Sequence, residues 1–152
     1  MESFLFIGIG NSMTYSSQML LTSHIGYLYN KIGRRLIDGF TLRQLQILAL
    51  LFENRAPTLG FLADKMGCSH QSIKDILLPL ERKGFIDILC DNTDKRRYRV
   101  VLTQPCVEYF KNKPPKVILE RYIKDLFAGI DGYSLSITVQ TIEHLIDNCK
   151  EI

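Results

Sequence analysis

The sequence predicts a mainly α-helical protein with one small β-hairpin. Apolar residues recur three and four positions apart through most of the chain, whereas residues 86–102 alternate between apolar and polar side chains on either side of a turn. Hydrophobic residues make up 46% and charged residues 23% of the 152, a composition that can bury a core. We therefore expect one domain, residues 1–152, with a central lobe over 41–103 and helical regions over 1–38 and 104–152.

The first helix is predicted over residues 12–38, with Gly39 as its left-handed C-terminal cap. Its apolar side chains form a single stripe at helical spacing. They are Leu21, Ile25, Leu28, Ile32 and Leu36. The apolar residues 4–9 lack the basic segment and the cleavage site of an export signal, so we expect an arm that packs on another surface, such as a partner subunit.

The next two helices are recognised by their first residues. Thr41 and Gln44 have the spacing of a capping box, in which each side chain binds the backbone N–H of the other residue. Thr58 is a favourable N-cap for a short helix that ends at Gly67.

A fourth helix is predicted from its N-cap Ser69 to Gly84. Pro79 lies inside it and should kink its last turn. Its buried face is expected to carry Ile73, Ile76, Leu77 and Leu80. A short helix, a turn with a glycine and a longer helix are the elements of a helix-turn-helix.

After this helix the period of the apolar residues changes to two. Strands are predicted over 86–90 and 97–102, with the turn-forming residues 91–94 between them. A hairpin directly after a helix-turn-helix is a wing. Residues 41–103 are therefore predicted to form a winged helix-turn-helix, flanked by a helical dimerisation region.

The dimerisation region is predicted from apolar faces that the small lobe cannot cover. Thr103 begins a helix that Pro114 and Pro115 interrupt, and another helix is expected over 117–128. The last helix has an apolar stripe at heptad spacing, made by Leu135, Val139, Ile142, Ile146 and Cys149. We expect a homodimer in which the terminal helices cover one another; packing on their own chain is the alternative.

The wing concentrates positive charge. Lys95, Arg96, Arg97 and Arg99 place four cations within five positions near the hairpin tip. Charges this close repel one another unless a polyanion such as DNA neutralises them. The alternative is a solvated strand edge that these residues protect from pairing with other strands. The position directly after a helix-turn-helix favours double-stranded DNA as the partner.

The first two turns of the fourth helix carry side chains that suit the major groove of DNA. Gln71 and His70 have hydrogen-bonding groups for base edges, and Lys74 suits a phosphate or a guanine. Asp75 repels phosphate, so we expect it to accept from a cytosine amino group or to pair with a cation. The remaining candidates, near helix N-termini that attract phosphate, are Thr58, Ser69 and Ser72. Each residue alone also suits an ordinary exposed helix face.

Three strings carry a family resemblance. They are TLGFLA at 58–63, LERKGFI at 80–86, and Asp-Lys-Arg at 94–96 followed by VVLT at 100–103. From Leu42 to Thr103 the chain resembles the MarR family of transcriptional regulators.

The resemblance implies roles for particular residues. Asp94 would brace the wing, and Arg96 would enter the minor groove, where negative potential attracts arginine. It also implies a small, often aromatic effector that releases the DNA. The candidates for the effector pocket are His24, Tyr27 and Phe110, with Tyr29 and Tyr122. The alternative is that these are ordinary aromatic residues of the core or dimer interface.

Other function classes lack their signatures. The sequence has no phosphate-cradling glycine loop, no Gly-x-Ser-x-Gly and no His-Glu-x-x-His, so we expect neither an enzyme nor a cofactor. The four cysteines have no paired spacing and the three histidines are far apart, so no metal site is expected. No segment suits a membrane span.

We therefore predict a cytoplasmic, sequence-specific DNA-binding transcriptional regulator. A two-fold symmetric homodimer would bind a pseudo-palindromic operator whose half-sites are about one helical turn apart. The alternative is a winged-helix module that binds proteins and not DNA. The modest net charge of +3 and the acidic Asp75 favour that alternative.

Overall fold

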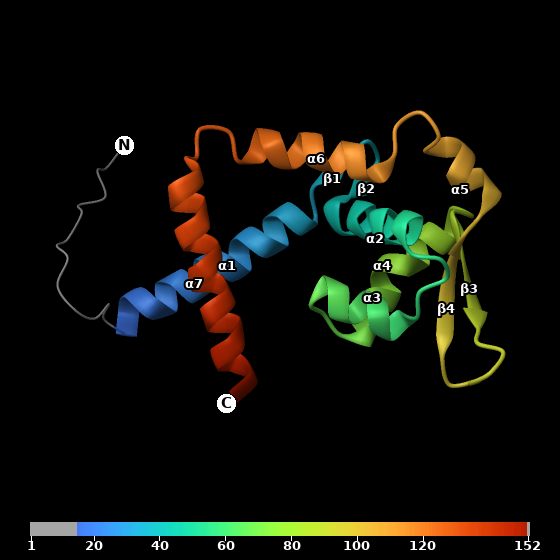
Figure 1. The fold of residues 1–152 in the computed structure, drawn as a ribbon, viewed down its shortest axis with the longest axis horizontal. Coiled ribbons are helices and arrows are strands. Elements are labelled where there is room, and N and C mark those ends of the chain that lie inside the picture. The colour runs from blue at the N-terminus through green and yellow to red at the C-terminus, as the bar shows by residue number, and fades with distance from the viewer. Residues whose placement is uncertain (1–14, 152) are drawn as a thin grey trace. The chain divides into compact units, whose positions relative to one another are not determined.

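The computed structural model describes residues 15–151 (Figure 1). The arm expected over 4–9 and the helix start expected at residue 12 lie outside the described residues. The chain has two compact units, one that extends to Gln44 and one that begins at Leu45. The single domain and the boundaries expected from the sequence stay predictions.

The chain is mainly α-helical with one longer hairpin, as the sequence predicts. The first unit contains α1 (Tyr15–Gly33), β1 (Leu36–Ile37), β2 (Phe40–Thr41) and the start of α2 (Leu42–Glu53). The rest of α2 belongs to the second unit, together with α3 (Leu59–Met66), α4 (His70–Arg82), β3 (Ile86–Cys90), β4 (Tyr98–Leu102), α5 (Gln104–Tyr109), α6 (Pro115–Leu126) and α7 (Gly132–Glu151).

The first helix ends earlier than predicted. α1 stops at Gly33, and residues 36–41 form a small antiparallel hairpin. Its turn residues, Asp38 and Gly39, have positive φ angles of 52° and 81°, as a type I′ turn requires. Asp-Gly is a strong hairpin signal, and it outweighs the apolar stripe that continues to Leu36. The prediction of a helix that extends to residue 38 was therefore wrong.

The helix starts form through the predicted caps. In the first unit, Thr41 N donates to Gln44 Oε1 at 3.0 Å and Gln44 N donates to Thr41 Oγ1 at 3.2 Å. In the second unit, the hydroxyls of Thr58 and Ser69 each accept a backbone N–H three residues further on, at 3.1 Å. Gly67 ends α3 in the left-handed conformation, with φ 60°. These local bonds fix where α3 and α4 begin.

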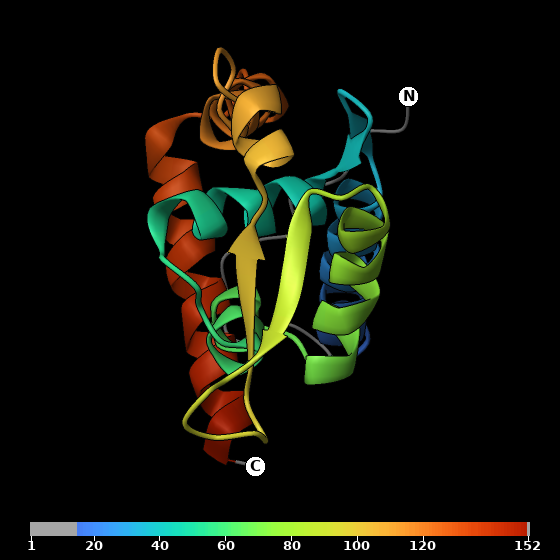
Figure 2. The same cartoon turned by 90° about the vertical axis from the view of Figure 1, so that its right-hand side faces the viewer.

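The core of the second unit holds the helix-turn-helix and the wing together. α3 packs on α4 and β4, and α4 packs on β3 (Figures 1 and 2). The helix α4 runs through Pro79 to Arg82. Side chains from these elements that are fully buried include Leu62, Ile73, Leu77, Leu80, Ile86 and Val100. Ile76, which we expected to be buried, is half-buried.

The terminal helices expose the apolar stripes that the sequence predicts for them. No described residue of α7 is buried, and Val139 and Ile146 of its stripe are 45% and 52% exposed. On α1, Leu21 and Leu28 are exposed as well. Within the described chain, no helix combines the length and the apolar character that a membrane span needs.

Candidate nucleic-acid interface

Five of the residues predicted for DNA line a concave surface between α3, α4 and the wing. This surface, with a volume of about 430 Å³, we call the basic concavity. Among its lining residues are Thr58 at the start of α3, His70 and Lys74 on α4, and Arg96 and Arg97 in the loop between β3 and β4. The fold therefore brings positive charges that are more than 20 residues apart in sequence to one surface.

The first turns of α4 and its N-cap carry further predicted residues. Gln71, Lys74 and Asp75 line a second concavity of about 300 Å³, together with apolar residues of the wing. Gln71 Nε2 donates to Asp75 Oδ1 at 2.9 Å. Ser69 Oγ lies 3.0 Å from the hydroxyl of Ser72, so these two side chains bind each other at the helix start.

The tip of the wing is shaped by Asp94. Its Oδ1 accepts the backbone N–H of Arg96 at 3.0 Å, and its carbonyl accepts the backbone N–H of Arg97 at 2.8 Å. Its Oδ2 also lies 3.4 Å from Arg97 Nε. These contacts suit the bracing role that the resemblance implies. Lys95 and Arg96 have exposed side chains.

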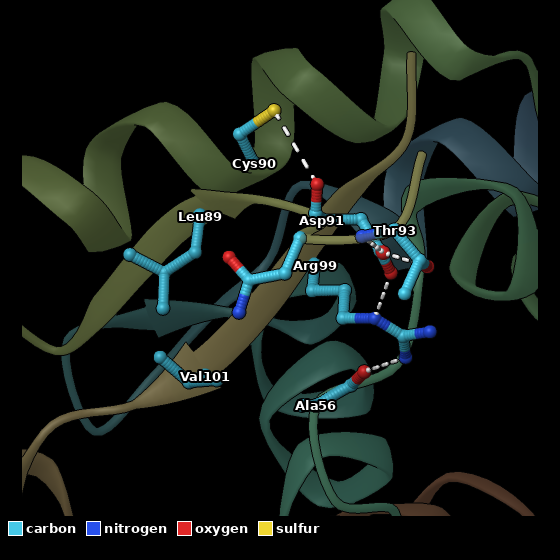
Figure 3. A pocket seen from close by; sticks show the side chains of 8 residues that line it. Ala56, Leu89, Cys90, Asp91, Thr93, Arg99 and Val101 are labelled. Atoms are coloured by element: carbon cyan, nitrogen blue, oxygen red, sulfur yellow. Dashed lines mark hydrogen bonds and ion pairs between the residues drawn. The ribbon is translucent and has the colours of Figure 1, made fainter. Parts of the chain in front are cut away.

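Arg99 was predicted from the sequence as a DNA-binding cation. In the structure its guanidinium contacts other groups of the same chain (Figure 3). Its Nε makes an ion pair with Asp91, and its Nη1 donates to the carbonyl of Ala56 at 2.9 Å. The side chain is still 43% exposed, so it also reaches solvent. The guanidinium thus connects the wing to the loop that precedes α3.

Asp91 was missed by the sequence analysis as a functional residue, although it is only 6% exposed. Its Oδ1 accepts from the backbone N–H of Thr93 at 2.8 Å, from the Thr93 hydroxyl at 2.6 Å and from the backbone N–H of Asp94 at 3.2 Å. An aspartate followed two residues later by a threonine in a turn is the available signal, because aspartate side chains often bind such backbone groups.

The same contacts control the ionisation of Asp91. The hydroxyl and the backbone N–H of Thr93, then the Arg99 guanidinium and the Asp94 N–H, hold the pKa of Asp91 well below its ordinary value of 3.8. A lowered pKa stabilises the folded state above the ordinary value, and this contribution is lost as the pH falls toward the lowered value. The Asp91 carboxylate is therefore charged across the physiological range.

Backbone bonds add to this connection between the wing and the helix-turn-helix. Val100 N donates to the carbonyl of Pro57 at 3.0 Å, and Thr58 forms an isolated bridge with Arg99. Ala56 adopts a positive φ of 50°, an uncommon conformation for a residue with a Cβ. The strand β4 is thus tied to the residues directly before α3.

The effector candidates have unlike environments. In the first unit, His24 and Tyr27 are exposed, and Lys31 Nζ lies 5.4 Å from the centre of the Tyr27 ring. In the second unit, Phe110 is 2% exposed. It contacts the rings of Phe52, Phe85 and Tyr109. The effector pocket stays a prediction.

The described residues offer few groups for thiol chemistry or metal binding. Burial raises the pKa of Cys106 to about 11, so this thiol is protonated at neutral pH. Cys90 and Cys149 are exposed and Cys68 is half-buried. Among the described residues, no three metal-ligating side chains come close enough to hold an ion.

Comparison with known families decides the classification of the lobe. Residues 40–98 match the model of the MarR family. This part of the chain is similar to the MarR family. The match extends from β2 to the start of β4 and includes α3, α4 and the loop at the tip of the wing.

Solved structures share the fold of the MarR-family lobe and its flanking helices. The S. aureus MepR–DNA complex is 19% identical, covers 91% of this chain and 99% of its own, and gives a TM-score of 0.66. A MarR/EmrR family regulator from Acinetobacter sp. ADP1 is 18% identical over 89% and 98% of the two chains, with a TM-score of 0.68.

A MarR transcriptional regulator from Methanosarcina mazei Go1 is 21% identical over 88% of this chain and 98% of its own, with a TM-score of 0.63. At these identities the likeness shows the fold. No curated protein is significantly similar in sequence.

Replacing Asp91 with asparagine tests whether its charge holds the wing. We expect Asp91→Asn to unfold at a lower urea concentration than the wild type at pH 7, because Arg99 loses its ionic partner. The difference should narrow below about pH 4, where the wild-type carboxylate loses its contribution. The measurement is urea unfolding followed by circular dichroism between pH 7 and pH 2.5.

The control for this series is Asp87→Asn, which removes a charge from an exposed position of β3. It should match the wild type at every pH. The charge-based role of Asp91 would be contradicted if Asp91→Asn and the wild type differed in their urea midpoints by the same amount at pH 7 and at pH 2.5.

Proposed function

We propose that this protein is a sequence-specific DNA-binding transcriptional regulator. The observation that carries the proposal is the basic concavity, where His70 and Lys74 of the helix-turn-helix face Arg96 and Arg97 of the wing. The MarR-family match of residues 40–98 supports it, and the S. aureus protein that shares the fold was solved with DNA.

In the proposed complex, α4 enters the major groove with its first turns. An α-helix fits this groove, and hydrogen-bonding side chains there can distinguish all four base pairs. Gln71, Lys74 and Asp75 would face the bases. The N-termini of α3 and α4, with their caps Thr58 and Ser69, would face phosphates through backbone N–H groups.

The wing would reach the adjacent minor groove through Arg96. Asp94 binds the backbone of Arg96, so folding leaves the guanidinium at the tip free to turn toward the DNA. A narrow minor groove concentrates negative potential and attracts arginine. Arg99 would act indirectly, since its contacts with Asp91 and Ala56 set the position of the wing.

We further propose that the protein binds DNA as a homodimer. The support is the exposed apolar stripe of α7 and the exposed apolar residues of α6, including Val117 and Ile123. Burying apolar surface against a second copy is favourable, and most homodimers are two-fold symmetric. A symmetric dimer would select a pseudo-palindromic operator, with each α4 in one of two successive major grooves.

Replacing Arg96 with alanine tests the DNA-binding surface. We expect the wild type to bind the duplex upstream of its own gene more tightly than a shuffled duplex, with affinity that falls steeply as salt rises. Arg96→Ala should bind about tenfold more weakly, because a base or groove contact typically contributes about 1 to 3 kcal/mol. Fluorescence anisotropy at several salt concentrations measures both effects.

The matched control is Arg121→Ala, which removes the same charge from an exposed position of α6. It should bind DNA like the wild type. If the wild type binds no duplex even at low salt, the proposal is wrong, and the alternative of a winged-helix module that binds proteins is favoured.

The homodimer has its own test in the stripe of α7. At micromolar concentration, sedimentation velocity should give twice the 17.5 kDa mass of the chain. Ile146→Lys places a charge in the stripe and should shift the protein toward monomer. Asn148→Lys, on the opposite side of α7, should leave the dimer intact. A wild type that sediments as a monomer would rule out the symmetric dimer.

A further inference from the structure

Gln71 and Asp75 lie on the exposed side of α4. Each lies two residues from the fully buried Ile73, which places it about 200° around the helix from that residue. Leu77 and Leu80 are also buried on the side of Ile73. Gln71 and Asp75 are therefore exposed on the side of α4 that faces away from the core.

The hydrogen bond between these two residues fixes the orientation of the Gln71 amide. The amide nitrogen lies 2.9 Å from Asp75 Oδ1. A carboxylate can only accept, so the amide atom that faces it must be the nitrogen. One N–H of Gln71 is thus used by Asp75. The amide still offers its oxygen as an acceptor and its second N–H as a donor.

We propose that Asp75 is a specificity-determining residue that orients Gln71 to read adenine in the major groove. The inference rests on the proposed function, since it requires that α4 enters DNA. Adenine presents a donor at N6 and an acceptor at N7, and the amide of glutamine matches both. The orientation imposed by Asp75 leaves one acceptor and one donor on Gln71, which is the complement of this pattern.

Guanine is rejected by the same arrangement. It presents two acceptors, O6 and N7, in the major groove. The oriented amide would meet O6 with its own oxygen, and the nearby carboxylate adds further repulsion. Asp75 thus lowers the overall affinity for DNA but increases the difference in affinity between adenine and guanine at this position. Specificity is such a difference in affinity. This gives the acidic residue a purpose beside the cations Lys74, Arg96 and Arg97.

The test is selection from a library of random duplexes by the full-length wild type and three variants. Gln71→Ala identifies the base pair that Gln71 reads, because preference is lost there. Asp75→Ala removes the orienting carboxylate and should preserve the fold, since alanine is the best helix former. Glu81→Gln, an exposed residue near the end of the same helix, removes an equal charge as the control.

The inference predicts adenine at the position that Gln71→Ala identifies. The wild type should prefer adenine to guanine there by about 5- to 150-fold, the range that one good bidentate contact provides. For Asp75→Ala, the preference for adenine over guanine at this position should be at least fivefold smaller. Its base preferences at the other positions should stay unchanged. Glu81→Gln should select the wild-type sequence.

Two results would overturn the inference, and they differ from failure of the proposed function. One is a wild-type motif without adenine at the Gln71 position. The other is an Asp75→Ala variant whose affinity changes equally for all sequences, with the same base preferences. If the wild type enriches no sequence at all, the proposed function itself is wrong and the inference falls with it.

Discussion

The position of the wing depends on one buried carboxylate. Asp91 accepts hydrogen bonds from the turn that follows it and pairs with Arg99 on the opposite strand. Arg99 in turn binds the loop before α3 through the carbonyl of Ala56. These contacts add to the packing of β3 on α4 and of β4 on α3, and the hairpin needs such support because an isolated hairpin is marginally stable in water. The basic concavity exists only while the wing stays beside α4.

This arrangement divides the charges of the wing into two groups. One group consists of Asp91, Asp94 and Arg99. Their side chains bind backbone groups of the wing loop and of the loop before α3, so these charges stabilise the fold. Lys95 and Arg96 project from the tip and remain available to a polyanion. A similar division holds on α4, where the side toward the core is apolar and the opposite side carries the Gln71–Asp75 pair. Rigid elements thus hold the groups that would meet DNA.

Local signals allowed much of the fold to be predicted. The caps at Thr41, Thr58 and Ser69 depend on residues three positions apart, and the wing on a change of the apolar period to two, so both can be read from the sequence. The early end of α1 could not be recognised from its apolar stripe, since the stripe continues into the hairpin at 36–41. The Asp-Gly turn at 38–39 is the better signal, because both residues adopt the positive φ angles of a tight hairpin.

The role of Arg99 required tertiary information. Its partners are Asp91, eight residues away and directly after the paired strand, and Ala56, 43 residues away in the loop before α3, and only the folded chain brings them together. The basic concavity likewise joins residues from separate elements, although each of its cations was predicted singly. A homodimer and an effector pocket depend on surfaces that a single chain does not define, so sequence patterns could only suggest them.

The most direct measurement of the central claim is a nuclear magnetic resonance titration of the isotopically labelled protein with a duplex that it selects. Chemical-shift changes should concentrate in the first turns of α3 and α4 and in residues 94–98 of the wing, with little change along α6. Changes confined to α6 and α7, or no change at equimolar duplex, would contradict a DNA-binding surface between the helix-turn-helix and the wing.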